Sequence, residues 1–410
     1  MGVLFQILGI VMLLVTAFLI VVKPRQGMMM ASFMSFSNFG LEAYFNYQLI
    51  YKILLLGALI SFILRVGLQR GWKKMLAILG IFFVYAFCIS IPSLSNKYGL
   101  VDMVTSYLTF FVGCLLMFVS WKHEKDILWM LKAVALMAPL NLLISFLSTG
   151  MLYADGFLVT SSSKAWVAYY AAISVMAVYM MRQMTGKYHI WLLLINAIVI
   201  LVAKQRTPFV IFAALSLPYL RDVTRHLRRR VVVAIMVCLP IVMIVGGLTL
   251  MDMIERTFDT SGSFGANNFI NSSNRLYVWE TLWTHSEGHH VFGLGLGFIK
   301  TMEGLFINLG FIAPHNEYLR FIFETGYIGL AIVMYAFASA YRRVYKRSPF
   351  RFMLWCFYLC YVFFAFFDNP ISSMQMFVPT SILLSIYSTC KGSNVQKKMA
   401  GSARIHGKAV

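Results

Sequence analysis

The chain has 410 residues, of which 60% are hydrophobic and only 12% are charged. Soluble globular domains carry roughly 25% charged residues, so this composition indicates an integral membrane protein. The formal net charge of +20 does not indicate a nucleic-acid partner, because the lysines and arginines gather in short segments between apolar runs, as the positive-inside rule predicts.

Twelve apolar runs predict an all-α integral membrane protein with about twelve transmembrane helices, since a membrane-spanning helix needs roughly 20 apolar residues. They lie at about 3–22, 48–64, 75–94, 101–121, 127–149, 165–181, 190–203, 209–220, 231–250, 319–340, 352–367 and 371–390. Residues 1–250 hold the first nine runs and residues 319–390 the last three. The stretch 251–318 is predicted to be one large external loop, and 391–410 a basic cytoplasmic tail.

Basic segments set the predicted orientation. Twelve crossings place both termini on the cytoplasmic side, together with the basic segments 65–74, 221–230 and 341–351 and the connections 122–126 and 182–189. The external loop carries seven acidic and three basic residues, the balance expected outside. Lys23 and Arg25 fall outside in this count, and 26–47 is expected to be re-entrant or interfacial.

Lys204 and Arg206 lie in a short polar turn between apolar runs of 14 and 12 residues. At 1.5 Å per residue these runs make helices of roughly 21 and 18 Å, which is shorter than the hydrocarbon core of about 30 Å. The two helices are therefore predicted to meet below the outer surface. Thr207 can cap the second helix and Pro208 suits its first position. A helix N-terminus with two cations favours anion binding, whereas the alternative is two cations that snorkel to the interface.

Asn274 and Arg275 open a predicted amphipathic helix in the external loop. Its apolar residues fall at helical spacing on one face, and its two tryptophans are typical of a helix at the bilayer interface: Leu276, Trp279, Leu282 and Trp283. Arg275 stands at the helix start, where its guanidinium can hold an anionic group through two N–H donors. The alternative is an ion pair with Glu280 or another loop acid.

Two further motifs in the loop have structural interpretations. The glycines of 293–297 lack the strand–turn–helix unit of a dinucleotide site, so they predict close backbone packing or a tight turn. The histidines of 285–290 match no standard spacing of zinc ligands, and no metal site or cofactor is expected.

His315 directly precedes the next predicted membrane helix. Pro314 ends the preceding extended stretch, and Asn316 or Glu317 can cap the helix. A helix N-terminus favours the neutral imidazole, which is the form that a general base requires. The alternative is a histidine that serves only as a hydrogen-bonding polar residue.

Three segments, in this order, resemble motifs of the O-antigen ligase/polymerase superfamily of bacterial envelope glycosyltransferases. They are KQRTPFVIF (204–212), NRLYVWETLW with HHVFGLGLGF (274–298), and PHNEYLRFIFETGYIGL (314–330). The resemblance covers roughly 190–340, and a layout of twelve spans with one large late loop also fits it. The first segment departs from the family pattern, because Lys-Gln stands where small residues usually precede the arginine.

The resemblance implies a GT-C-like fold and a metal-independent, inverting glycosyltransferase without a cofactor. The implied donor is an undecaprenyl-diphosphate-linked oligosaccharide, and the acceptor is a hydroxyl of a glycan or glycolipid. His315 would take the acceptor proton, while Arg206 and Arg275 would hold the departing diphosphate. Substrate contacts are expected from the polar residues beside these three: Lys204, Asn274, Asn316 and Glu317. Arginines suit this role, since a leaving phosphate needs positive charge and the external loops contain no Asp-x-Asp metal motif.

Several activities fit this expectation. The first choice is a polymerase that joins repeat units of an O-antigen, capsule or exopolysaccharide, with a chain-length regulator as a partner; the loop has no extra basic patch for a phosphorylated acceptor. The alternative within the superfamily is a ligase that moves the polymer onto a lipid A core. A non-enzymatic flippase of lipid-linked sugars is disfavoured, because the two sets of six spans show no repeat and Lys52 and Lys132 lie near helix ends. The expected location is the bacterial inner membrane, with the active site on the periplasmic face.

Overall fold

The structure is a computed structural model that describes residues 2–35, 37, 41, 47–91, 97–149, 164–226, 275–302, 315–371 and 373–389. The regular elements of these residues are helices, which agrees with the predicted all-α class. The first nine are α1 (Gly2–Val22), α2 (Pro24–Met34), α3 (Tyr47–Val66), α4 (Trp72–Ser90), α5 (Lys97–Leu116), α6 (Glu124–Thr149), α7 (Lys164–Thr185), α8 (Ile190–Ala203) and α9 (Arg206–His226). They are followed by α11 (Arg275–His285), α12 (Phe298–Thr301), α14 (Glu317–Arg347), α15 (Arg351–Phe364) and α16 (Met374–Thr389).

Each predicted apolar run coincides with one of these helices, except 231–250, which lies outside the described residues together with Asn274 and the tail 391–410. Five described helices are long and apolar enough to cross a membrane: Leu49–Val66, Trp72–Ser90, Glu124–Leu147, Lys164–Thr185 and Glu317–Arg347. Shorter apolar helices accompany them, including Ile190–Ala203. The chain is therefore a helical membrane protein, whereas the number of twelve spans stays a prediction.

The turn between α3 and α4 marks one end of the helix bundle. The backbone N–H of Gln69 donates to the carbonyl of Phe118, after α5, at 2.7 Å. The Nη2 atom of Arg343, near the end of α14, donates to Oε1 of Gln69 at 2.9 Å. The basic segments 65–74 and 341–351 therefore lie together, and we call this the basic end.

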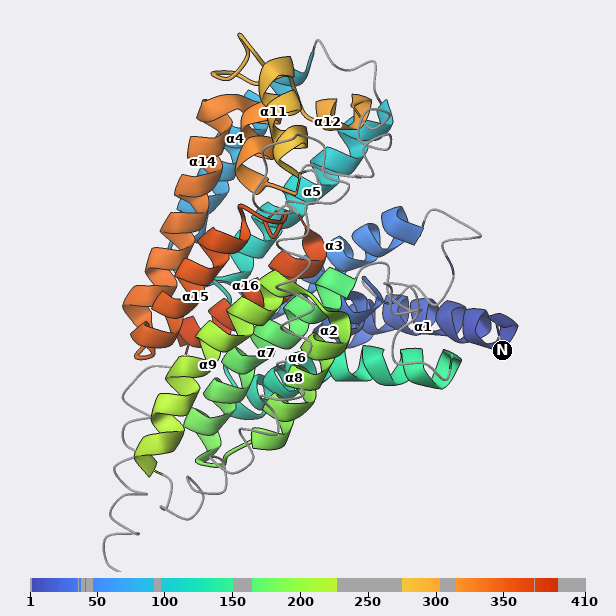
Figure 1. Cartoon of the computed structure of the whole chain (residues 1–410), viewed down its shortest axis with the longest axis vertical. Coiled ribbons are helices and arrows are strands. Elements are labelled where there is room, and N and C mark those ends of the chain that lie inside the picture. Colours follow the sequence, from blue (N-terminus) through green and yellow to red (C-terminus); the bar gives the residue numbers. More distant parts are fainter. Residues whose placement is uncertain are drawn as a thin grey trace, which may run out of the picture.

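The segment that contains α11 and α12 lies at the end of the bundle opposite the basic end, beside the last residues of α4 and the first turns of α14. The hydroxyl of Tyr85 donates to the carbonyls of Phe292, at 3.0 Å, and Thr325, at 2.8 Å. The hydroxyl of Ser90, the last residue of α4, accepts from the backbone N–H of Leu296 at 2.8 Å. Figure 1 shows α11 and α12 gathered at the top of the molecule, beside the start of α14.

Helix α7 is the central helix of the other half of the molecule. Every residue from 167 to 178 is buried, and α6, α8, α9 and α16 pack around it. Tyr179 meets Phe350 edge-on with ring centroids 5.9 Å apart, and the guanidinium of Arg221 lies over the ring of Phe352. The ends of α7 and α9 therefore lie beside the start of α15 at the basic end, so α9 starts toward the opposite end.

The position expected for Lys23 and Arg25 is corrected by the structure. Arg25 forms an ion pair with Asp126 at the start of α6. The Nη1 atom of Arg65 donates to the carbonyl of Val22 at 2.9 Å. Lys23 and Arg25 thus lie at the end of the molecule that holds 65–74, and not at the opposite end. A short buried helix, α2, follows Lys23 and packs on α1 and α3.

Candidate active site

The polar turn of the KQRTP segment joins α8 to α9 at a sharp backbone change. Lys204 adopts a left-handed conformation, with φ of 49°, and its N–H bonds to the carbonyls of Ile200 and Leu201. A non-glycine residue in this region is uncommon and marks a constrained turn. The short helix expected before the turn is present as α8. The helix after the turn, α9, is longer than expected, because it runs for 21 residues from Arg206 to His226. Since α9 starts at Arg206, Thr207 lies inside its first turn instead of capping it. The side chains of Lys204 and Arg206 are half-buried.

Arg275 occupies the first position of α11, as expected, and its helix is held against α14. Val278 and Leu282 of α11 are buried with Ile299 and Phe323 in a small apolar cluster. The face expected to be continuous is divided, because the side chains of Leu276 and Trp283 are exposed. The packing of α11 against this cluster fixes the start of the helix, and with it the position of Arg275.

The guanidinium of Arg275 is bound to the loop between α15 and α16. Its Nη1 atom donates to the carbonyl of Phe367 at 2.7 Å. Burial lowers the pKa of Arg275 below the usual value of an arginine; the carboxylate of Asp368 opposes this shift, and the positive charge of Arg206 adds to it. The guanidinium groups of Arg206 and Arg275 are therefore within electrostatic reach of each other, with Asp368 close by.

His315 stands immediately before α14 and faces the same carboxylate. Its Nδ1 atom lies 3.4 Å from Oδ1 of Asp368, and its side chain is 35% exposed. The backbone of His315 is left-handed, with φ of 48°, which is a second strained position at this site. When Nδ1–H of a neutral ring donates to Asp368, the lone pair lies on Nε2, so this nitrogen can accept a proton.

The two residues after His315 have structural roles at the start of α14. Asn316 is the N-cap, and its Oδ1 accepts from the N–H of Leu319 at 3.1 Å, so the expected capping is confirmed. Glu317 is fully buried, and its Oε2 accepts from the N–H of Ile371 at 2.8 Å. Its own N–H donates to the carbonyl of Ala365 at 2.8 Å. Glu317 therefore fastens the loop between α15 and α16 to the start of α14.

Asp368 is the site residue that the sequence reasoning missed. It lies in the short connection between the apolar runs 352–367 and 371–390. Its Oδ1 also accepts from the N–H of Asn369 at 2.8 Å, and the hydroxyl of Tyr361 holds the carbonyl of Pro370 at 2.9 Å. The sequence feature that indicates a role for Asp368 is its isolation as a single acidic residue in an apolar region, where an ionisable residue is costly and often functional.

The glycines of 293–297 explain how the segment is attached to α14. Helix α14 is broken at Gly326, where φ is 65° and ψ is −176°. Around this break the N–H groups of Leu294 and Gly295 donate to the carbonyls of Phe323 and Glu324, at 2.9 and 3.0 Å. A Cβ on Gly293 would lie 2.6 Å from the backbone of Glu324. The expected close backbone packing is therefore confirmed.

The site thus gathers four parts of the chain: the starts of α9, α11 and α14, and the loop before α16. Arg275 and His315 lie beside Asp368, and Arg206 is near enough for its charge to act on Arg275. Lys204 lies two residues from Arg206, while Asn274 is outside the described residues. Two guanidinium groups, one carboxylate and one imidazole form an arrangement that can hold an anion beside a proton acceptor.

One known family matches the part of the chain that holds most of these residues. Residues 191–334 match the family model described as O-antigen ligase. The matched stretch contains Arg206, Arg275 and His315 and ends before Asp368. Neither the curated proteins nor the solved structures gave a match to the chain. The resemblance to the O-antigen ligase/polymerase superfamily is therefore confirmed over residues 191–334.

Proposed function

We propose that the protein is a membrane glycosyltransferase that moves a saccharide from an undecaprenyl-diphosphate-linked donor to an acceptor hydroxyl. The observation that supports this proposal is that Arg275 lies beside the His315–Asp368 pair, with Arg206 near enough for its charge to act on Arg275. A diphosphate leaving group needs fixed positive charge, and an acceptor hydroxyl needs a base; both lie within this group.

The proposed reaction is a direct displacement at the anomeric carbon. The acceptor oxygen attacks that carbon from the side opposite the diphosphate, so the new glycosidic bond has inverted configuration. The bond between the anomeric carbon and the phosphate oxygen breaks, and its electron pair leaves with the diphosphate. The acceptor proton passes to Nε2 of His315, whose Nδ1 faces Asp368.

The arginines supply the charge that a metal ion would otherwise supply. Preorganised donors aimed at developing negative charge stabilise a transition state without reorganising during the reaction. One N–H of Arg275 donates to the carbonyl of Phe367, and this bond fixes the guanidinium in place. The other N–H donors of Arg275 bind the ligand in this proposal. In this proposal the transfer is metal-independent and needs no cofactor, and Lys204 adds positive charge at the turn before Arg206.

The membrane orientation follows from the separation of the two ends. The candidate site lies at the end of α14 opposite to Arg343 and the basic turn after α3. With the basic end in the cytoplasm, as the positive-inside rule requires, the site faces the periplasm. This is the side on which a polymerase would receive lipid-linked repeat units.

The test is a reaction with the full chain reconstituted in liposomes and supplied with lipid-diphosphate-linked repeat units. A polymerase yields a ladder of longer lipid-linked saccharides and releases the lipid diphosphate. Saccharide transfer that occurs only when a lipid A core is added would assign the ligase activity instead. Movement of donor across the bilayer without any new glycosidic bond would contradict the proposal and indicate a flippase.

A further inference from the structure

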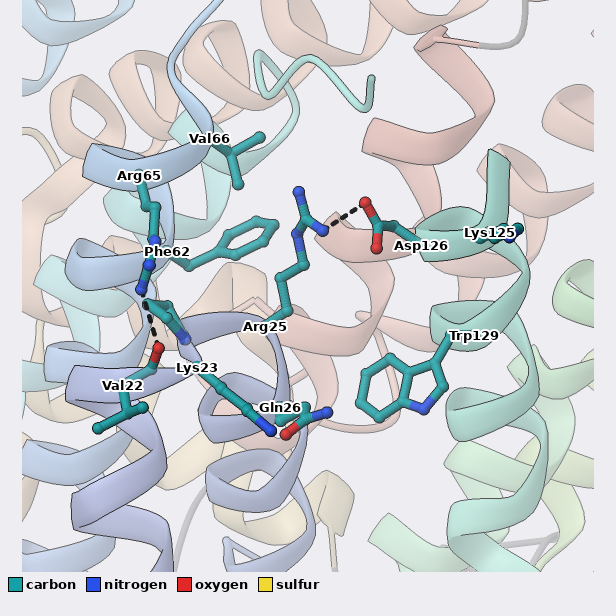
Figure 2. A pocket seen from close by; sticks show the side chains of 11 residues that line it. Val22, Lys23, Arg25, Gln26, Phe62, Arg65, Val66, Lys125, Asp126 and Trp129 are labelled. Atoms are coloured by element: carbon teal, nitrogen blue, oxygen red, sulfur yellow. Dashed lines mark hydrogen bonds and ion pairs between the residues drawn. The ribbon is translucent and has the colours of Figure 1, made fainter. Parts of the chain in front are cut away.

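A cavity of about 530 Å³ lies at the basic end, away from the candidate active site. It opens where the turn between α1 and α2 meets the end of α3 and the start of α6, and its polar lining is Lys23, Arg25, Arg65, Lys125, Asp126 and Gln26. Figure 2 shows the side chain of Arg25 reaching across to Asp126, and Arg65 bonded to the carbonyl of Val22.

The cavity is strongly cationic. Four basic side chains line it against one acid, Asp126, whose partner is Arg25. Arg65 is anchored by its bond to Val22, so its charge is held at the wall. Within the described part of the chain, neither Lys23 nor Lys125 forms an ion pair. The positive charge is therefore in excess where the cavity opens, and an anion would balance it.

The backbone also adds positive charge at the cavity. Helix α2 starts at Pro24, directly at the cavity, and its N-cap residue Lys23 makes no side-chain capping bond. The first N–H groups of a helix carry a partial positive charge and attract phosphate. Gln26, in the first turn, adds a neutral amide beside them.

The surroundings favour a lipid head group as the source of that anion. Phe62, Val66 and the half-exposed Trp129 form the apolar part of the lining, and tryptophan is typical of the membrane interface. An exposed apolar stripe on α1 leads to the cavity through Leu14, Phe18 and Val21. The stripe could lie along acyl chains while the cavity holds the head group.

We propose that this cavity binds the phosphate of an anionic phospholipid, such as phosphatidylglycerol, in the leaflet at the basic end. The phosphate lies in the cavity that Lys23, Lys125 and Arg65 line, and the acyl chains follow the apolar stripe of α1. The site is separate from the candidate active site, and the inference does not depend on the proposed reaction.

The test uses the full chain in a mild detergent, titrated with phosphatidylglycerol, phosphatidylcholine or inorganic phosphate, and native mass spectrometry to count the bound molecules. The double variant Lys23→Gln/Lys125→Gln removes two lining charges. Lysine is unfavourable at a helix N-terminus, so this change should not weaken α2 or α6. The matched control is Lys73→Gln/Lys74→Gln, which removes two exposed lysines at the same end that do not line the cavity.

We expect the wild type to prefer phosphatidylglycerol over phosphatidylcholine, and the lining variant to lose affinity about fivefold for each lysine removed. The control should bind like the wild type. Asp126→Asn should act in the opposite direction and tighten binding, because it frees Arg25 from its partner. Equal losses in the lining variant and the control would overturn the proposal. So would inorganic phosphate that displaces phosphatidylglycerol at equal concentration, since the site would then bind the free ion.

Discussion

The Nδ1 atom of His315 lies 3.4 Å from Oδ1 of Asp368, although the two residues are 53 positions apart in the chain. Glu317 sets this relationship by holding Ile371 and Ala365 against the start of α14. A carboxylate at this position selects the ring tautomer that has its lone pair on Nε2. Asp368 is therefore assigned as the residue that positions His315 for proton transfer.

Replacing Asp368 by asparagine should lower kcat by about 10- to 100-fold and leave KM nearly unchanged, because the change disturbs the base and not the donor contacts. His315→Ala should lower kcat further, by about 100- to 10,000-fold. Steady-state rates of lipid diphosphate release, measured with the reconstituted chain, check both values.

Asp222→Asn is the matched control for the change at Asp368. Asp222 also pairs with a basic side chain, Arg182 at 3.5 Å, but it lies toward the end of α9 that is remote from the site. The turnover of this variant should stay within about twofold of the wild type, because distant sites with no shared partners act independently. Comparable losses at both aspartates would mean that Asp368 acts on stability alone.

Arg206→Lys keeps the positive charge but removes the planar pair of N–H donors that fits a diphosphate. We expect turnover to fall by about 100-fold or more, which is typical of the loss of one preorganised donor. The melting temperature should not fall, because lysine keeps the positive charge and a long side chain at this half-buried position.

The control for Arg206→Lys is Arg221→Lys, on the same helix but over the ring of Phe352 at the basic end. It should leave turnover unchanged. Full activity of Arg206→Lys would assign Arg206 to the membrane interface, as the snorkelling alternative predicts.

Gly326→Ala should strongly destabilise the protein. The backbone at this break, with φ of 65° and ψ of −176°, is available almost only to glycine, and a Cβ would lie 2.2 Å from the carbonyl oxygen of Val291. Residues forced into such a region cost about 1–3 kcal/mol before any clash is counted. Thermal unfolding in detergent should show the loss.

The comparison for this variant is Gly80→Ala in α4, where an added Cβ would meet nothing within 4 Å. That change should be neutral or should stabilise the protein by up to about 1 kcal/mol, because alanine is the better helix former. Equal stability of the two alanine variants would show that the break at Gly326 is not required.

The helices could be predicted because most apolar runs are long and end at polar or basic residues. Helix α8 has the predicted bounds, 190–203, since His189 and Lys204 flank a run that is apolar except for Asn196. Helix α2 was missed because residues 26–47 mix methionine, serine and glycine without a clear period. The break at Gly326 could not be predicted either, since a single glycine is compatible with an intact helix.

The candidate site could be predicted only as separate parts. Arg206, Arg275 and His315 stood out as cations or bases beside helix starts, and the resemblance gave their order. Their proximity in the fold depends on contacts between segments that are far apart in the chain. A single sequence does not show which distant segments make contact. Asp368 was missed for the same reason: its role comes from the fastening of its loop by Glu317, and that carboxylate was expected to contact substrate or to cap α14.

Asn316 offers a test of whether capping or substrate binding explains its position. Asn316→Ala should lower the stability of the protein by about 1 kcal/mol, the usual cost of losing an N-cap. Asn316→Ser keeps a side-chain oxygen for the N–H of Leu319, so it should restore the melting temperature. If Asn316 only caps α14, the serine variant also recovers turnover, because His315 keeps its place before the helix. A serine variant with normal melting temperature but a raised KM for the donor would instead assign the amide of Asn316 to substrate binding.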